Sequence, residues 1–273
     1  EIAVEIDEEI FIRKKTINKL RRDAISLLKE QLASPHKREQ ITIKKAKLSD
    51  NRKIKPEKNV EIMTNDINPS LLQGFDNLYI KSYDPKYKGF NLYLNLDSHM
   101  DYEIESLLEY LKENSIKGVI FNNYRDLAFI DDFKSAGINI RIGRYLNVIN
   151  SYSFDFYSDF AEKIESSVEN TLDNINENSK RYPVEALTFA RIELMNMVHC
   201  PFSTIKKCSL KGCGTCKFRE GELVNINKDK MRIIRNNSIS KIYPLDVAGI
   251  DEDLFADQVS YLISVFSGKD LED

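Results

Sequence analysis

The residues best suited to chemistry in this sequence are its four cysteines, which all lie in one short stretch. They are Cys200, Cys208, Cys213 and Cys216, and the chain has no others. Thiolates bind borderline and soft metals, so a Cys-x7-Cys-x4-Cys-x2-Cys spacing in one loop can close a four-sulfur site on zinc or on an iron–sulfur cluster. Zinc sites of four cysteines usually carry two Cys-x2-Cys pairs, and this loop has one. The spacing therefore favours iron–sulfur and leaves zinc open.

Other uses of the cysteines also stay open. Two disulfides, or a group of buried thiols without a metal, would also use all four cysteines. We favour a metal site because the sequence has no charged-then-apolar leader and no apolar run of the roughly 18 to 20 residues that a membrane span requires. This pattern predicts a cytoplasmic protein with no membrane partner, and disulfides are rare in that compartment.

Polar residues near the cysteine loop are the candidates for a binding or catalytic pocket. Arg191 and Glu193 precede the loop, and His199 is adjacent to Cys200. A histidine beside a metal loop is as suited to catalysis as to a structural role. Side chains that exchange hydrogen bonds or protons with a ligand are expected both here and upstream. The expected pocket residues are Asn147, Asn150, Glu169, Arg191 and Glu193.

Strand-like and helix-like segments alternate after the first 58 residues. Strands are expected over residues 60–63, 78–80, 90–94, 119–121, 138–140, 163–167, 184–189 and 192–197, and a hairpin over 231–234 and 239–243. Helices are expected from a cap at Asp101, over residues 125–136 and, at the end, over residues 254–266. This rhythm predicts an α/β fold, a parallel βα barrel-like (TIM-like) domain with right-handed crossovers, either closed or incomplete.

In a domain of this kind, function lies where strands end and loops begin. Polar residues follow several of the expected strands. They are Asn65, Asp66, Lys81, Asp97, His99, Asn122, Asn123, Arg144 and the run from Tyr145 to Ser151. Such side chains are suited to hydrogen-bonding a polar ligand, although each asparagine is equally suited to capping a helix.

The first 58 residues differ from the rest of the 273-residue chain in charge. They carry sixteen Lys and Arg against ten Asp and Glu, a net +6, whereas the remainder carries −9 and the whole chain −3. Residues 16–32 predict an amphipathic helix with basic residues crowded at its start. We expect residues 1–33 to end a preceding domain with this helix, residues 34–58 to form a basic linker, and residues 59–273 to form the barrel-like domain. The basic segment over residues 13–58 is either an RNA-binding element or a solvated linker.

Three motifs resemble those of the collagenase-like peptidase family U32. The run Arg191-Ile-Glu-Leu-Met195, followed by His199-Cys200-Pro201, resembles the family signature. The run Leu146-Asn-Val-Ile-Asn150-Ser151 is similar to a Leu-Asn-x-x-Asn-Ser motif, and Ser167-Val-Glu169 to a Ser-x-Glu motif. The likeness spans roughly residues 59–250. Ala190 and Asn170 depart from the family pattern.

The resemblance implies the C-terminal half of a larger protein, with the N-terminal half as a partner. Relatives of this family support hydroxylation of RNA bases or of quinone precursors and hold an iron–sulfur cluster through clustered cysteines. For this chain it implies a cluster of the 4Fe-4S type, with zinc as the alternative. The expected substrate-binding residues are Asn147, Asn150 and Ser167, and the expected catalytic residues are Glu169, Arg191, Glu193 and His199.

The family name also implies a metal-supported peptidase, and this alternative stays open. The sequence offers little for proteolysis, because it has three histidines, no His-Glu-x-x-His motif, and no thiol for attack if all four cysteines bind a metal. A second alternative is a structural half that docks on the N-terminal half and uses the cysteines as a staple.

Overall fold

A computed structural model describes residues 12–33, 55–64, 66–99, 101–206, 208, 216, 220–236 and 239–271. The chain divides into two compact units, Glu1–Lys45 and Ala46–Asp273. In the first unit, the expected amphipathic helix is present as α1 (Lys14–Ala33). Most of the expected linker over residues 34–58 lies outside the described residues.

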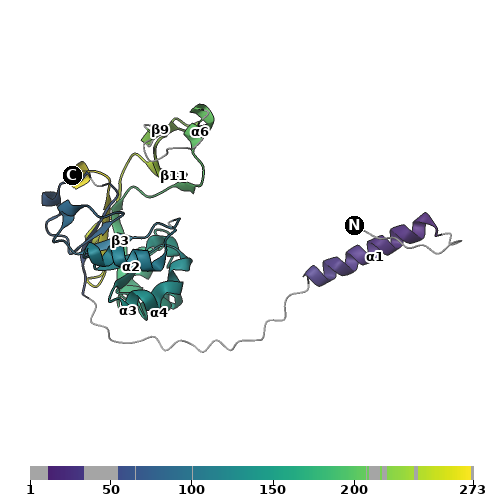
Figure 1. The fold of residues 1–273 in the computed structure, drawn as a ribbon, viewed down its shortest axis with the longest axis horizontal. Helices are drawn as coiled ribbons and strands as arrows, with labels where there is room; N and C mark the ends of the chain where they lie inside the picture. The colour runs from purple at the N-terminus through teal and green to yellow at the C-terminus, as the bar shows by residue number, and fades with distance from the viewer. Residues whose placement is uncertain are drawn as a thin grey trace. The chain divides into compact units, whose positions relative to one another are not determined.

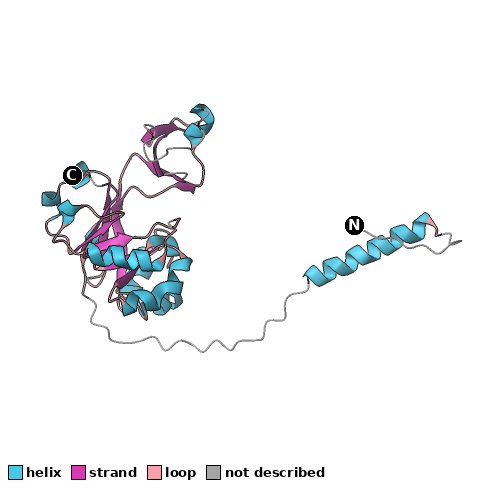
Figure 2. Ribbon diagram, in the orientation of Figure 1, coloured by secondary structure: helices cyan, strands magenta, loops and turns pink. Residues whose placement is uncertain are grey.

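The second unit contains a closed barrel of eight parallel strands, which confirms the expected βα barrel. Figure 2 colours the strands magenta and the helices cyan. The strands, in order around the barrel, are β1 (Lys58–Ile62), β2 (Asn77–Ile80), β3 (Leu92–Asn95), β4 (Gly118–Phe121), β5 (Asn139–Ile142), β6 (Lys163–Glu165), β7 (Val184–Ala190) and β13 (Ser260–Val265). The last strand, β13, closes the ring by pairing in parallel with both β7 and β1. The short β12 (Ala248–Gly249) pairs antiparallel with the end of β7.

Helices connect the strands from β3 to β7 and lie around the outside of the barrel (Figure 1). They are α2 (Ile104–Glu113), α3 (Ile130–Ser135), α4 (Ser151–Ser158) and α5 (Leu172–Ser179). Single 3-10 turns, η1 (Pro69–Leu72) and η2 (Pro85–Tyr87), occupy the connections before and after β2. The side chains of Asn123 and Asn150 cap the turn η3 (Tyr124–Phe129) and α4, so these two asparagines do act as helix caps.

A small antiparallel sheet is inserted between the last two barrel strands. Its strands lie side by side in the order β8 (Met195–Met197), β11 (Ile239–Pro244), β10 (Lys230–Asn236) and β9 (Glu220–Val224). The short α6 (Pro201–Lys206) lies beside this sheet (Figure 1). The expected hairpin is present as β10 and β11. All four cysteines fall between β8 and β9, so the cysteine loop belongs to this insertion and not to the barrel wall.

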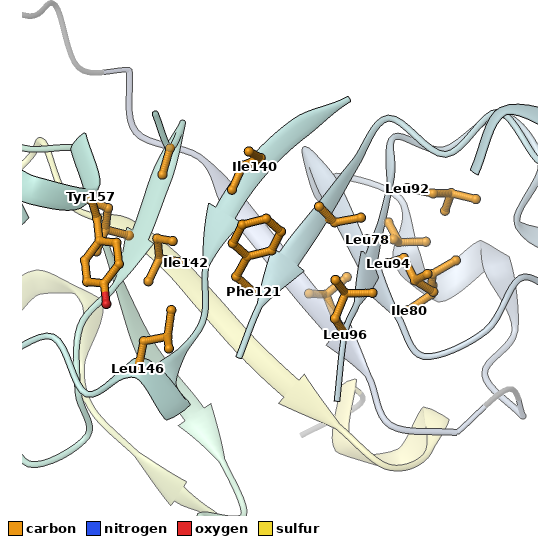
Figure 3. Packing of buried hydrophobic residues seen from close by; sticks show 14 of the residues in the cluster. Leu78, Ile80, Leu92, Leu94, Leu96, Phe121, Ile140, Ile142, Leu146 and Tyr157 are labelled. Atoms are coloured by element: carbon orange, nitrogen blue, oxygen red, sulfur yellow. The ribbon is translucent and has the colours of Figure 1, made fainter. Parts of the chain in front are cut away.

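The two faces of each barrel strand have different chemistry because successive side chains point to opposite sides. The outer faces carry apolar residues that pack under the helices (Figure 3); they include Leu78, Ile80, Leu92, Leu94, Phe121, Ile140 and Ile142. The inner faces carry a small separate apolar cluster around Tyr79, Tyr93 and Leu262, and several buried polar residues. The barrel therefore has an apolar shell outside and a largely polar interior.

One expected helix is wrong. Residues 254–266 form the turn η6 (Glu252–Leu254) and then β13, the strand that closes the barrel. The apolar spacing fits a helix, but the segment also alternates, with Ser260, Leu262 and Ser264 buried in the interior beside β1 and β7. Pairing with two neighbouring strands outweighs the helical pattern. The expected cap at Asp101 is also wrong, because the N-cap residue of α2 is Glu103.

Gly118 at the start of β4 allows a close approach inside the barrel. A Cβ atom at this position would lie 2.5 Å from Cε1 of Tyr93 and 2.6 Å from the carbonyl oxygen of Asn139. We expect Gly118→Ala to lower the free energy of unfolding by about 1–3 kcal/mol, measured by urea denaturation. Gly249→Ala is the matched control, because its nearest neighbour would lie 3.7 Å away. Equal stability of the two variants would contradict this account of the interior.

Candidate functional site

The amino-terminal part of the barrel interior is organised around the buried Arg141 of β5. Its guanidinium donates hydrogen bonds to the hydroxyls of Tyr79 at 2.7 Å and Tyr93 at 3.1 Å, and it lies 3.0 Å from a carboxylate oxygen of Glu57. The Tyr79 hydroxyl in turn donates to Glu185 at 2.7 Å. These hydrogen-bonded and ion-paired side chains come from several strands and hold one another in place as one layer of the barrel interior, which we call the Arg141 layer.

A second arginine, Arg144, lies just beyond the end of β5 between two glutamates. Its Nη2 is 2.7 Å from Oε2 of Glu61 on β1, and its Nε is 2.7 Å from Oε1 of Glu165 on β6. The backbone N–H of Arg144 also donates to Oε2 of Glu165 at 3.1 Å. One guanidinium thus joins β1, β5 and β6 across the barrel.

The pKa values of the two glutamates beside Arg144 are shifted in opposite directions. Burial raises the pKa of Glu165 to about 8, and the negative charges of Glu185 and Glu61 add to this effect against the attraction of Arg144. Burial would also raise the pKa of Glu61, but the charges of Arg144 and Lys81 hold it below its usual value. Glu61 is therefore the counter-ion of Arg144, while Glu165 retains its proton more readily.

A cavity of about 270 Å³ opens at the carboxyl ends of the barrel strands. Glu61 of β1, Lys81 after β2 and Asp97 after β3 line one part of it, and Arg144 and Glu169 line another. This is the end at which active sites of βα barrels are found. The volume suits a small polar ligand or one group of a larger one.

Strand β11 of the inserted sheet and the segment between β7 and β8 supply one wall of this cavity, centred on Glu193. Oε2 of Glu193 accepts hydrogen bonds from the hydroxyls of Tyr145 at 2.7 Å and Tyr243 at 3.3 Å. Nζ of Lys241 lies 3.3 Å from the same oxygen and 3.2 Å from Oδ2 of Asp97. Burial and the charge of Glu193 raise the pKa of Tyr145 and of Tyr243, so both phenols stay protonated as donors. Strand β11 is thereby tied to barrel loops through one carboxylate.

Lys81 lines this cavity and forms no ion pair within 4.0 Å with a residue that the structure describes. Burial of its ammonium group and the positive charge of Lys241 lower the pKa of Lys81, and the carboxylates of Glu61, Asp97 and Glu193 oppose this shift. Lys81 is nevertheless an exposed residue, so its side chain contacts solvent. A lysine in this setting can bind an anionic group or act as a base.

Five of the seven expected substrate-binding and catalytic residues line this cavity. They are Asn147, Ser167, Glu169, Arg191 and Glu193. Asn147 adopts a left-handed backbone conformation, φ 50° and ψ 55°, at the end of the turn η4 (Arg144–Leu146). Arg191 is held by Asp270, 2.9 Å away, and donates from Nε to the carbonyl oxygen of Leu245 at 2.9 Å.

Two expected residues lie elsewhere. The side chain of Asn150 accepts a hydrogen bond from the backbone N–H of Ser153, so it is occupied as the cap of α4 and does not line the cavity. His199 is exposed beyond β8, and its carbonyl oxygen accepts a hydrogen bond from the Ser240 hydroxyl at 2.6 Å. Neither residue shares the cavity with Glu193.

The described cysteines lie on both sides of α6. Cys200 is buried, and its Sγ accepts a hydrogen bond from Nη1 of Arg235 at 2.6 Å. Ser203 contacts both flanks, because its hydroxyl donates to the carbonyl oxygen of Cys200 and its carbonyl oxygen accepts from the N–H of Cys208. Cys213 lies outside the described residues, and the described ones include no group of three potential metal ligands.

Several residues of the site were not expected from the sequence. Lys241 and Tyr243 belong to the predicted hairpin, but no local signal places β11 at the barrel mouth. Glu61, Glu165 and Glu185 sit inside expected strands, where a charged residue on an alternating pattern usually indicates a solvent-facing position. The repeated occurrence of a glutamate within these expected parallel strands was the signal in the sequence for a polar barrel interior.

Comparison with known proteins adds no assignment: neither a family model, nor a curated protein, nor a solved structure matches the chain. Among the helices of the described ranges, none has the length and apolar character needed to cross a bilayer.

Glu165 makes the stability of the barrel depend on pH. Its pKa of about 8 in the folded chain lies above the ordinary value of 4.5, so between these values the folded state binds the proton more tightly than the unfolded state. Stability is then lost as the pH rises through this window, by on the order of a few kcal/mol. We expect Glu165→Gln, which mimics the protonated carboxyl, to lose less stability than wild type between about pH 5 and about pH 9 in urea denaturation.

The control for this measurement is Glu177→Gln, which alters an exposed carboxylate on α5 that is paired with Lys180. This variant should retain the wild-type pH dependence. Parallel stability curves for wild type and Glu165→Gln would contradict the assignment of Glu165.

Proposed function

We propose that this chain is part of a U32-type enzyme that binds a small polar substrate or an RNA base at the barrel mouth. In this proposal the cysteine loop holds an iron–sulfur cluster, and the enzyme takes part in hydroxylation. The proposal rests on the motif resemblance and on one structural observation, the composition of the cavity wall.

That observation is that residues of both the barrel and the inserted sheet line one cavity. Arg144, Asn147 and Glu169 come from barrel loops, whereas Lys241 and Tyr243 come from the inserted sheet that also bears the cysteine loop. A substrate in the cavity would contact the barrel and the insertion together. This supports a shared role for the two parts over a purely structural insertion.

The surroundings of Cys200 suit a thiolate ligand. Thiolates are the usual ligands of iron–sulfur clusters, and hydrogen bonds to the sulfurs tune the cluster. Arg235 supplies such a hydrogen bond to the buried Cys200, and its positive charge offsets negative charge on the sulfur. Cys200, Cys208, Cys213 and Cys216 would hold the cluster, which when bound supplies electron transfer. Zinc is the alternative for the same four thiolates.

Helix α1 supports RNA as a partner. Its first turn has no acidic residue, and Arg13, Lys14, Lys15, Lys19, Arg21 and Arg22 lie at or near its start. Positive charge at a helix N-terminus opposes the helix dipole, and RNA phosphates would relieve this repulsion.

The cofactor is tested by metal and sulfide analysis of the full chain purified without oxygen. We expect about four iron and about four sulfide per chain, together with visible absorption. Cys200→Ser should lose most of the iron, because it removes a buried ligand. The control Val198→Ser changes a neighbouring side chain that is 70% exposed and should retain the iron.

Other results of the same analysis would contradict the proposal. Stoichiometric zinc without colour would replace the cluster with a structural or hydrolytic zinc site. Absence of both metals would remove the cofactor. Gelatin cleavage that is abolished by Glu193→Gln would favour the peptidase alternative.

RNA binding is tested by its salt dependence. We expect a mixed-sequence single-stranded RNA to bind with an affinity that falls steeply with salt. The double variant Lys15→Glu with Lys19→Glu should weaken binding and reduce the slope of log affinity against log salt by about 1 to 2. Lys112→Glu with Lys134→Glu makes the same charge change on α2 and α3 and should have a smaller effect. Equal effects of the two double variants would remove α1 as the RNA-binding element.

A further inference from the structure

The charges that line the cavity are paired with two exceptions. Eight charged side chains line it: Glu61, Lys81, Asp97, Arg144, Glu169, Arg191, Glu193 and Lys241. Six of these form ion pairs, namely Arg144 with Glu61, Arg191 with Asp270, and Lys241 with Asp97 and Glu193. Lys81 and Glu169 form none within 4.0 Å among the residues that the structure describes. Lys81 and Glu169 are thus the two charged groups of the lining without an ion pair, while the carboxylates that share Lys241 also act on Lys81 from a longer distance.

The two unpaired charges come from opposite walls of the barrel. Lys81 directly follows β2, and Glu169 lies in the loop after β6. In the closed ring of eight strands, β2 and β6 are four strands apart in both directions. A ligand that reaches both residues must therefore extend across the mouth of the cavity.

Each of the two charges has a physical reason to accept a partner. Both side chains are exposed to solvent, and Lys241 repels Lys81. Glu61, Asp97 and Glu193 attract Lys81, but none of them forms an ion pair with it within 4.0 Å. On the other wall, the backbone N–H of Glu169 donates to the Ser167 hydroxyl, but the carboxylate of Glu169 makes no hydrogen bond or ion pair to a described residue. Charged groups that lose solvent when a ligand enters are costly unless the ligand pairs with them.

We propose that the ligand of this cavity is a small zwitterion of the amino-acid class, with its acidic group against Lys81 and its amine against Glu169. This inference rests on the proposed function, because it names the substrate class of the same cavity. A neutral ligand would leave both charges unpaired, and a singly charged ligand would leave one. The volume of about 270 Å³ admits a small molecule and excludes a folded partner from the interior.

The first test compares ligands on the wild-type chain. The probes are glycine, β-alanine, 4-aminobutyrate and 5-aminopentanoate, in which the two charges are increasingly far apart, together with butyrate and butylamine as singly charged controls. Binding is measured as the shift of the thermal unfolding midpoint at constant ionic strength. We expect at least one zwitterion to bind about tenfold more tightly than both controls. Equal or weaker binding of all four zwitterions would overturn the inference.

The second test assigns each end of the ligand. Lys81→Met should weaken the preferred zwitterion about tenfold and leave butylamine unchanged, whereas Glu169→Gln should weaken it similarly and leave butyrate unchanged. Lys88→Met and Glu109→Gln alter exposed residues of the same types outside the cavity and should bind as wild type does. Wild-type affinity in either cavity variant, with circular dichroism unchanged, would also overturn it.

The failure of this inference is distinguishable from failure of the proposed function. Iron and sulfide are measured on the same preparation and do not depend on Lys81 or Glu169. A cluster-bearing chain without zwitterion preference overturns only the ligand class. A chain that binds the zwitterion but holds neither iron nor sulfide overturns the proposed function and leaves the ligand class supported.

Discussion

The structure depends on the balance of charge inside the barrel. Small parallel barrels are usually filled by branched apolar side chains, but this interior holds two arginines, Arg141 and Arg144. Glu57 and the Tyr79–Glu185 pair surround the first, and Glu61 and Glu165 surround the second. In a medium of low dielectric, loss of Glu61, the counter-ion of Arg144, would leave an uncompensated charge. The strands are therefore held in register by electrostatics as well as by the apolar shell outside.

This charge balance also determines what the cavity presents to a ligand. Arg144 is held by both Glu61 and Glu165, so its guanidinium is a fixed part of the cavity wall. Glu193 is fixed in the same way by two phenols and by Lys241. Because these groups are already satisfied, they orient a ligand without having to reorganise. The groups that still require partners are fewer, and these are the ones that select the ligand.

The sequence predicted the α/β barrel because its apolar runs and helical stripes alternate in the right rhythm. It did not predict β13, since Leu254, Val259, Leu262 and Val265 are spaced as on a helix and the competing strand pattern becomes decisive only through pairing with β7 and β1. Five of the expected site residues line the cavity, and they could be singled out because they lie near strand ends and in recognisable motifs. Lys241 could not be found in this way, because its place in the cavity depends on a sheet that folds back from a distant part of the chain.

The position of the insertion has a consequence for how the chain folds. The strand that closes the ring, β13, pairs with β7, from which the whole inserted sheet separates it in sequence. It also pairs with β1, the first strand of the domain. Contacts between residues so far apart in sequence make folding slow, because the entropy of closing long loops is lost before the contacts form. Until β13 arrives, β1 and β7 are open sheet edges that can pair with other chains. Any ligand or metal that orders the insertion early shortens the effective loop, and so favours ring closure over intermolecular pairing.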